Sequence, residues 1–235
     1  MAKPRTIHAC QACGAQQSRW HGRCPDCGAW DSLVEESFAP PRAAAGGSGR
    51  GGDGLAARAG AAADEKPRRL AEIDGDASPR IVTGEQELDR VLGGGFVPGS
   101  VVLLGGDPGI GKSTLALQLA GRLAAAGRAV LYVSGEESAE QIKLRAERLA
   151  GLGGSLQILT TTRVESLAGP LAELAPSVVV VDSIQTIATD AIESAAGSVA
   201  QVRESAAQLA AAAKRLGAVL LLIGHVTKDG QLAGP

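Results

Sequence analysis

Short apolar runs alternate with longer amphipathic stretches along the chain from Pro67 onward. The apolar runs consist mainly of Val, Leu and Ile without intervening polar residues, which is typical of strands that are buried on both faces. The stretches between them predict helices. The predicted strands are 100–106, 129–135, 155–160, 177–183 and 218–224, and the predicted helices are 112–127, 138–150, 164–174 and 197–217.

Local signals mark some ends of these helices. Ser138 and Gln141 have the spacing of a capping box, and Gly127 is a stop signal after the first helix. Pro170 should interrupt the helix over 164–174. Because strands separated by helices form right-handed βαβ units, we expect an α/β fold with a mostly parallel sheet.

The first part of the chain has a different character. Residues 1–36 hold all four cysteines and both tryptophans, whereas residues 37–66 are rich in Ala, Gly and Pro and have no apolar periodicity. A segment with the composition of residues 37–66 cannot bury enough surface to fold, and it predicts a flexible linker. The predicted organisation is a small domain over 1–36, a linker over 37–66 and the α/β core over 67–235.

Composition narrows the possible classes of protein. The chain has 235 residues, of which 45% are hydrophobic and 2% aromatic, and its net charge is −2. Any nucleic-acid site must therefore be a local patch with few rings for stacking on bases. No apolar run approaches the roughly 20 residues that span a bilayer, and the N-terminus has no apolar signal region. We expect a cytoplasmic protein without a membrane partner, where cysteines bind metal more readily than they form disulfides.

The segment GGDPGIGKST joins a predicted strand to a predicted helix and contains a phosphate-loop pattern. Its glycines let backbone N–H groups turn toward phosphate oxygens, and the helix adds the positive end of its dipole. Lys112 would reach the β and γ phosphates of ATP, Ser113 would ligate Mg²⁺ and Thr114 would lie over the α phosphate. A glycine-rich turn that matches by chance is the alternative. The predicted nucleotide-binding residues of this segment are Gly106, Asp107, Pro108, Gly109, Ile110, Gly111, Lys112, Ser113 and Thr114.

Acidic residues follow two of the predicted strands. Asp182 ends the strand over 177–183, where it would hold the hydration shell of Mg²⁺ or, alternatively, cap a turn. Glu136 and Glu137 follow the strand over 129–135, at the sheet edge where ligands of open α/β sheets bind. A carboxylate there could orient the water that attacks the γ phosphate, or simply favour the dipole of the next helix.

The cysteines form two CxxC pairs, Cys10 with Cys13 and Cys24 with Cys27, each followed by Gly. This pattern predicts a zinc finger in which four cysteine thiolates hold Zn²⁺ tetrahedrally, and metal binding would drive the folding of a segment too short for its own core. Disulfides or free thiols are the alternatives. Trp20 and its basic neighbours could contact nucleic acid or protein, or Trp20 could be the small core of the finger.

Several motifs together resemble the family of bacterial DNA repair proteins called RadA or Sms. They are RWHGRCPDCGAWDSLVEE, TGEQELDRVLGGGFVPGSVVLLGGDPGIGKST, YVSGEES, VVVVDSIQT, GSVAQVRESA and GHVTKDG, in the order of the family. The resemblance covers nearly all of the chain except the linker. It implies a RecA-like ATPase core that works on DNA in homologous recombination, by branch migration or helicase-like movement. It further implies a hexameric ring and a recombinase partner.

The resemblance also assigns roles to single residues. Glu136 takes the position of the catalytic glutamate, with Glu137 as second choice, and His225 takes that of a γ-phosphate sensor. Without the family, His225 would be an ordinary polar residue at the end of a strand. Residues 186–198 match a loop that faces DNA in the ring, although this loop is not basic, and Arg203 beyond it is a candidate for DNA or interface contact.

Members of this family continue past the end of this sequence into further core strands, a Lys-Asn-Arg-Phe-Gly motif and a domain that resembles the Lon protease. We therefore expect a C-terminally incomplete core that binds ATP–Mg²⁺ weakly and hydrolyses it slowly, if at all. Two other functions stay open. One is a RecA-fold signalling ATPase or kinase of the clock-protein type, which TGEQELDRVLGGG also resembles. The other is a nucleotide-binding fragment without turnover.

Overall fold

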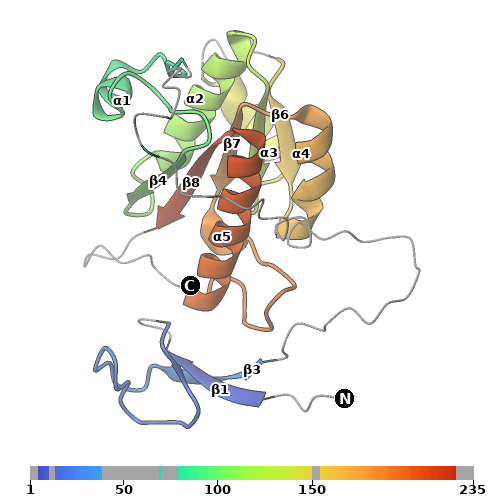
Figure 1. Cartoon of the computed structure of the whole chain (residues 1–235). Coiled ribbons are helices and arrows are strands. Elements are labelled where there is room, and N and C mark those ends of the chain that lie inside the picture. The colour runs from blue at the N-terminus through green and yellow to red at the C-terminus, as the bar shows by residue number, and fades with distance from the viewer. Residues whose placement is uncertain (1–4, 11–13, 39–68, 70–78, 150–153, 226–235) are drawn as a thin grey trace.

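The computed structural model describes residues 5–10, 14–38, 69, 79–149 and 154–225. Within these ranges the chain forms a small three-stranded sheet and a larger five-stranded sheet. Figure 1 shows the small sheet, built from the N-terminal part of the chain, below one end of the long helix α5.

The small sheet has the strand order β2-β1-β3 and is antiparallel. Because β3 pairs with β1 as far as Phe38, it runs past position 36, and the remainder of the predicted linker lies outside the described residues. The interior of this unit is minimal, with Cys10, Cys24 and Leu33 buried and Ala15 packed against them. Its strands are β1 Arg5–Cys10, β2 Gln16–Gln17 and β3 Leu33–Phe38.

The large sheet has the strand order β4-β8-β7-β5-β6, and all of its neighbouring strands are parallel. The predicted α/β fold with a parallel sheet is thus confirmed. Because the strands are parallel, their carboxyl ends meet at one edge, called here the carboxyl edge, and β8 brings His225 to it between β4 and β7. The strands are β4 Val101–Gly106, β5 Val130–Ser134, β6 Gln157–Thr160, β7 Val178–Asp182 and β8 Val219–His225.

Helices cover both faces of this sheet (Figure 1). Alternate strand residues point to opposite faces, so Tyr132 packs in one apolar layer and Val133 in the other. Every residue of β5 and β7 is buried, which explains the unbroken apolar runs. One face carries α1 Gln86–Val91, α2 Lys112–Ala125 and α3 Ala139–Glu147, and the other carries α4 Ala168–Leu174 and α5 Val199–Leu216.

The ends of the helices follow the local signals, with one exception. The capping box of Ser138 and Gln141 is present at the start of α3. Pro170, predicted to interrupt a helix, instead lies in the first turn of α4, directly after the 3-10 turn η3 Val164–Leu167. A first-turn residue has no intrahelical partner for its N–H group, so proline costs nothing there. In the described part of the chain, no helix combines the length and the apolar character needed to cross a membrane.

Candidate nucleotide and metal sites

The phosphate loop, residues 106–113, leads from the carboxyl end of β4 into the first turn of α2. Gly109 and Gly111 have φ angles of 80° and 97°, in the left-handed region that side chains other than glycine rarely adopt. A Cβ atom at either position would meet nothing within 4 Å, so the backbone conformation and not crowding calls for glycine. Residues 107–111 are exposed, which leaves this turn open to an anionic ligand.

Lys112 folds its side chain back over this loop and is only 7% exposed. Its Nζ donates to the carbonyl oxygens of Gly106 and Asp107, at 2.7 and 2.8 Å. The same Nζ lies 3.4 Å from Nδ1 of His225, because β8 places His225 beside Gly106 in the parallel pairing. The structure therefore brings together two side chains that are far apart in the sequence.

Asp182 is 5% exposed and is held through both carboxylate oxygens. Ser113 donates its hydroxyl to Oδ1 at 2.9 Å, which joins the phosphate loop to the end of β7. Tyr132 donates its phenol to Oδ2 at 2.5 Å. Burial, followed by the adjacent carboxylate of Asp182, raises the pKa of Tyr132 well above its ordinary value, so the phenol keeps its proton.

Sequence reasoning missed Tyr132 and its neighbour Arg145. Arg145, on α3, places Nη2 2.8 Å from the Glu137 carboxylate and 3.4 Å from the Tyr132 hydroxyl. The signal in the sequence was faint: Tyr132 is the single tyrosine of the chain and interrupts an aliphatic strand. Because a buried phenol normally finds a hydrogen-bond partner, a tyrosine in a buried strand predicts such a partner.

The two adjacent glutamates point to different partners. Glu136 accepts a hydrogen bond from Ser183 at 2.5 Å, and its Oε1 lies 3.9 Å from Nε2 of His225. Glu137 instead forms the ion pair with Arg145. Glu136 is thus on the side of the phosphate loop, whereas Glu137 is engaged by α3.

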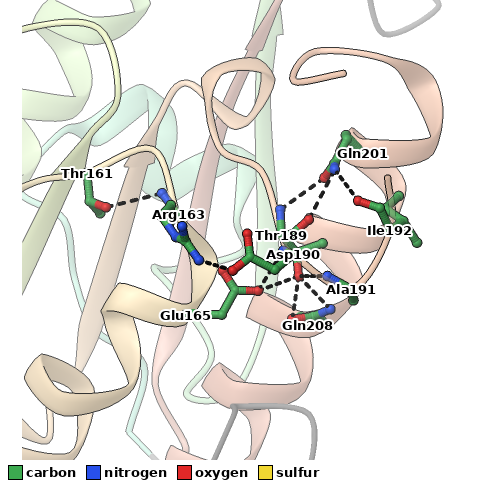
Figure 2. Close-up of polar contacts among 9 residues, drawn as sticks. All are labelled: Thr161, Arg163, Glu165, Thr189, Asp190, Ala191, Ile192, Gln201 and Gln208. Atoms are coloured by element: carbon green, nitrogen blue, oxygen red, sulfur yellow. Dashed lines mark hydrogen bonds and ion pairs between the residues drawn. The ribbon is translucent and has the colours of Figure 1, made fainter. Parts of the chain in front are cut away.

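The loop between β7 and α5, which the resemblance matches to a DNA-facing loop, is braced by buried polar side chains (Figure 2). The amide of Gln201, 2% exposed, accepts from the N–H of Thr189 at 3.0 Å and donates to the carbonyls of Thr189, Ile192 and Ser194 at 2.9–3.2 Å. Glu165 accepts from the Thr189 hydroxyl at 2.6 Å. Asp190 of this loop pairs with Arg163, so the described contacts offset its charge. These hydrogen bonds hold the backbone of the loop around residues 189–194.

In the N-terminal unit, the Sγ atoms of Cys10, Cys24 and Cys27 lie within 4.8 Å of one another. The Cys10 and Cys27 sulfurs are 3.7 Å apart, close to the roughly 3.8 Å that tetrahedral geometry with zinc–sulfur bonds of about 2.3 Å requires. Cys13, the predicted fourth ligand, lies outside the described residues. The arrangement of these cysteine sulfurs therefore fits a zinc ion bound by thiolates.

The same backbone hydrogen bond joins the first cysteine of each CxxC pair to the glycine that follows the pair. The N–H of Gly14 donates to the carbonyl of Cys10 at 2.7 Å, and the N–H of Gly28 donates to that of Cys24 at 2.9 Å. Both glycines have positive φ angles, of 73° and 76°. In the second CxxC pair, both Cys24 and Cys27 belong to the cluster of sulfurs.

The tryptophans of this unit do not form its core. Trp20 is 58% exposed and Trp30 is 72% exposed, which excludes Trp20 as the small core of the finger. The guanidinium of Arg23 lies 5.7 Å from the ring centroid of Trp30. The contact is a cation–π interaction at the surface.

Comparison with known proteins places the chain in a class. A family profile described as an AAA domain matches residues 66–231, and the chain belongs to this family. A second profile, described as a rubredoxin metal binding domain, matches residues 8–35.

Among named proteins, the chain is similar over its whole length to proteins called DNA repair protein RadA, which confirms the resemblance found in its motifs. It is 51% identical to the protein from Pseudomonas aeruginosa, 46% to that from Halalkalibacterium halodurans and 46% to that from Bacillus subtilis. It covers 49–50% of each, so the chain spans about half the length of these curated relatives.

Proposed function

We propose that this chain binds ATP with Mg²⁺ at the carboxyl edge of its large sheet and supplies the nucleotide site of a DNA repair ATPase. The observation that carries the proposal is the convergence at this edge of Lys112, the Ser113–Asp182 pair, Glu136 and His225. Together they offer a cation for phosphate, a hydroxyl and a carboxylate for a divalent cation, and a carboxylate acceptor for a water molecule.

Each residue has a distinct task in this proposal. Lys112 leaves the loop carbonyls and donates to the β and γ phosphates instead, because an ammonium group forms stronger hydrogen bonds with an anion than with neutral oxygens. Ser113 and Asp182 hold Mg²⁺, which when bound neutralises charge on the phosphates. Glu136 orients the attacking water, and His225, within 3.4 Å of Lys112 and 3.9 Å of Glu136, is well placed to sense the γ phosphate.

The role in DNA repair rests on the similarity to the RadA proteins and on the AAA domain. We propose that ATP hydrolysis is coupled to DNA during homologous recombination, in branch migration or helicase-like movement. The braced loop over 186–198 and Arg203 are the candidate DNA contacts, and a hexameric ring and a recombinase are the proposed partners. The cytoplasm is the proposed location.

We further propose that the N-terminal unit binds one Zn²⁺ through Cys10, Cys13, Cys24 and Cys27. Two exposed tryptophans and Arg23 make its surface suitable for a stacking contact with nucleic acid or for a contact with protein.

A fluorescent ATP analogue tests the nucleotide site directly. We expect weak binding to this chain that strengthens with Mg²⁺, and any slow ATP turnover should rise when single-stranded DNA is added. Binding without turnover would leave a nucleotide-binding module, and absence of Mg²⁺-dependent binding would contradict the proposal as a whole.

A further inference from the structure

The carboxylate of Asp182 is fixed by a buried phenol that the proposed nucleotide chemistry does not use. Tyr132 is fully buried, and its hydroxyl lies 2.5 Å from Oδ2 of Asp182. Oδ1 of the same carboxylate accepts from Ser113 at 2.9 Å. With one oxygen occupied by Tyr132, only the other faces the phosphate loop.

Strand pairing explains how the phenol reaches this carboxylate. Tyr132 on β5 is opposite Val180 on β7, and Ser134 is opposite Asp182. Side chains two residues apart on a strand share a face, so Tyr132 and Asp182 are diagonal neighbours on the face covered by α2 and α3. A phenylalanine would fill this position equally well but could not donate to the carboxylate.

Arg145 extends this arrangement to α3. Its Nη2 lies 3.4 Å from the Tyr132 hydroxyl, 2.8 Å from Glu137 and 3.9 Å from Oδ2 of Asp182. The hydroxyl can therefore accept from a cation while it donates to an anion, and hydrogen bonds in such a chain polarise and strengthen one another. Glu137 forms an ion pair with Arg145. Of the two adjacent glutamates, Glu136 is therefore the one that is available to a ligand.

We propose that Tyr132, supported by Arg145, is a positioning residue that fixes the rotamer of Asp182 for a Mg²⁺–nucleotide complex. The inference rests on the proposed function of the carboxyl edge. Residues that hydrogen-bond to a metal ligand without touching the metal orient that ligand. Their loss typically lowers metal affinity about 10- to 100-fold. A purely structural phenol would contribute to stability but not to the coupling between Mg²⁺ and nucleotide.

The substitution Tyr132→Phe tests this role, with binding of a fluorescent ATP analogue measured across a Mg²⁺ titration. We expect the Mg²⁺ concentration at half-saturation to rise about 10-fold, while the weak binding without Mg²⁺ stays unchanged. Arg145→Gln should shift the same midpoint in the same direction by a smaller factor. It provides a second measurement should Tyr132→Phe fold poorly.

Val133→Ala is the matched control, because Val133 is a buried residue of the same strand that points to the opposite face. It should lower the thermal midpoint without changing the Mg²⁺ midpoint. An unchanged Mg²⁺ midpoint in both test variants, or a shift no larger than that of Val133→Ala, would overturn the positioning role and leave the proposed function intact. Absence of any Mg²⁺ effect in the unaltered chain would overturn both.

Discussion

Lys112 keeps its ammonium group in contact with two loop carbonyls, at 2.7 and 2.8 Å, and is almost fully buried there. Lys112→Ala removes the cation proposed to bind the β and γ phosphates. A hydrogen bond to a charged group contributes about 1.5–3 kcal/mol, so the affinity for ATP should fall about 10- to 100-fold. Fluorescent-nucleotide titration measures this loss.

The matched control for Lys112→Ala is Lys143→Ala, which removes an exposed lysine of α3 that pairs with Glu147 at 3.4 Å. It should leave ATP affinity unchanged. The metal content of the N-terminal unit should also be unchanged in both variants. Equal affinities of Lys112→Ala and the unaltered chain would contradict the assigned role of Lys112.

Glu136 and Glu137 are adjacent in sequence but have different partners, Ser183 with His225 nearby for the first and Arg145 for the second. Glu136→Gln keeps the shape of the side chain and removes its ability to act as a base. We expect any ATP turnover of the chain to fall about 10²- to 10⁴-fold with little change in ATP binding. Glu137→Gln should mainly weaken the dependence of binding on Mg²⁺, because it releases Arg145.

The opposite assignment, with turnover lost in Glu137→Gln and retained in Glu136→Gln, would contradict this division of roles. Single-turnover measurements separate the two effects, since they report the chemical step apart from binding.

Lys112, Ser113 and Asp182 were predictable because their types and spacing are tied to a local motif or to the end of a buried strand. Tyr132, Arg145 and Gln201 were not, because their roles arise from contacts between elements that are separate in sequence. The apolar run around Tyr132 predicts that this residue lies in a strand and packs in the apolar core, but it predicts no partner for the hydroxyl. Only the register of β5 against β7 gives its hydroxyl a partner at Asp182.

At the scale of elements, the buried amide of Gln201 makes four of the hydrogen bonds that hold the loop between β7 and α5. Gln201→Ala would leave the backbone groups of Thr189, Ile192 and Ser194 without this partner. Since a buried polar group left without a partner costs about 1–3 kcal/mol, the free energy of unfolding should fall by about that amount or more. Urea denaturation measures the change, and amide exchange should become faster within residues 189–194.

Gln86→Ala is the control for this substitution, because Gln86 is an exposed glutamine at the start of α1. It should change neither the free energy of unfolding nor amide exchange in the loop. Unchanged exchange in Gln201→Ala would mean that Glu165 and the strand ends suffice to hold the loop.

The elements of the large domain were the most predictable part of the structure. Strands that are buried on both faces rarely carry polar residues, so β5, β7 and β8 stand out in the sequence as largely apolar runs. Pro170 shows the limit of such reasoning, since its effect depends on which turn of the helix it occupies. The segment over 164–174 divides into η3 and α4 just before the proline, at the boundary between Leu167 and Ala168.

At the scale of the whole molecule, the N-terminal unit and the large domain have separate interiors. The buried residues of the first are Cys10, Cys24 and Leu33, and none of them belongs to either apolar layer of the large sheet. Gly14 of the N-terminal unit lies against α5, where a Cβ atom at this position would come within 2.6 Å of Nη1 of Arg203 and 3.0 Å of Cγ1 of Val199. Such a contact can orient the N-terminal unit but cannot replace a core.

Removal of the metal should therefore unfold the N-terminal unit and leave the large domain folded. For small sites of this kind the metal supplies roughly 10–16 kcal/mol of apparent binding free energy, which is the folding free energy of the unit. The chain carries its own reporters, because Trp20 and Trp30 are its only tryptophans and Tyr132 its only tyrosine. On addition of a chelator selective for Zn²⁺, with Mg²⁺ kept in excess, tryptophan anisotropy should fall as the unit loosens, while the thermal midpoint of the large domain and its nucleotide affinity stay unchanged. Cys24→Ser should reproduce this state without a chelator, and Ser18→Ala, at an exposed position of the same unit, should not. Loss of nucleotide binding on chelation would instead show that the two units fold as one.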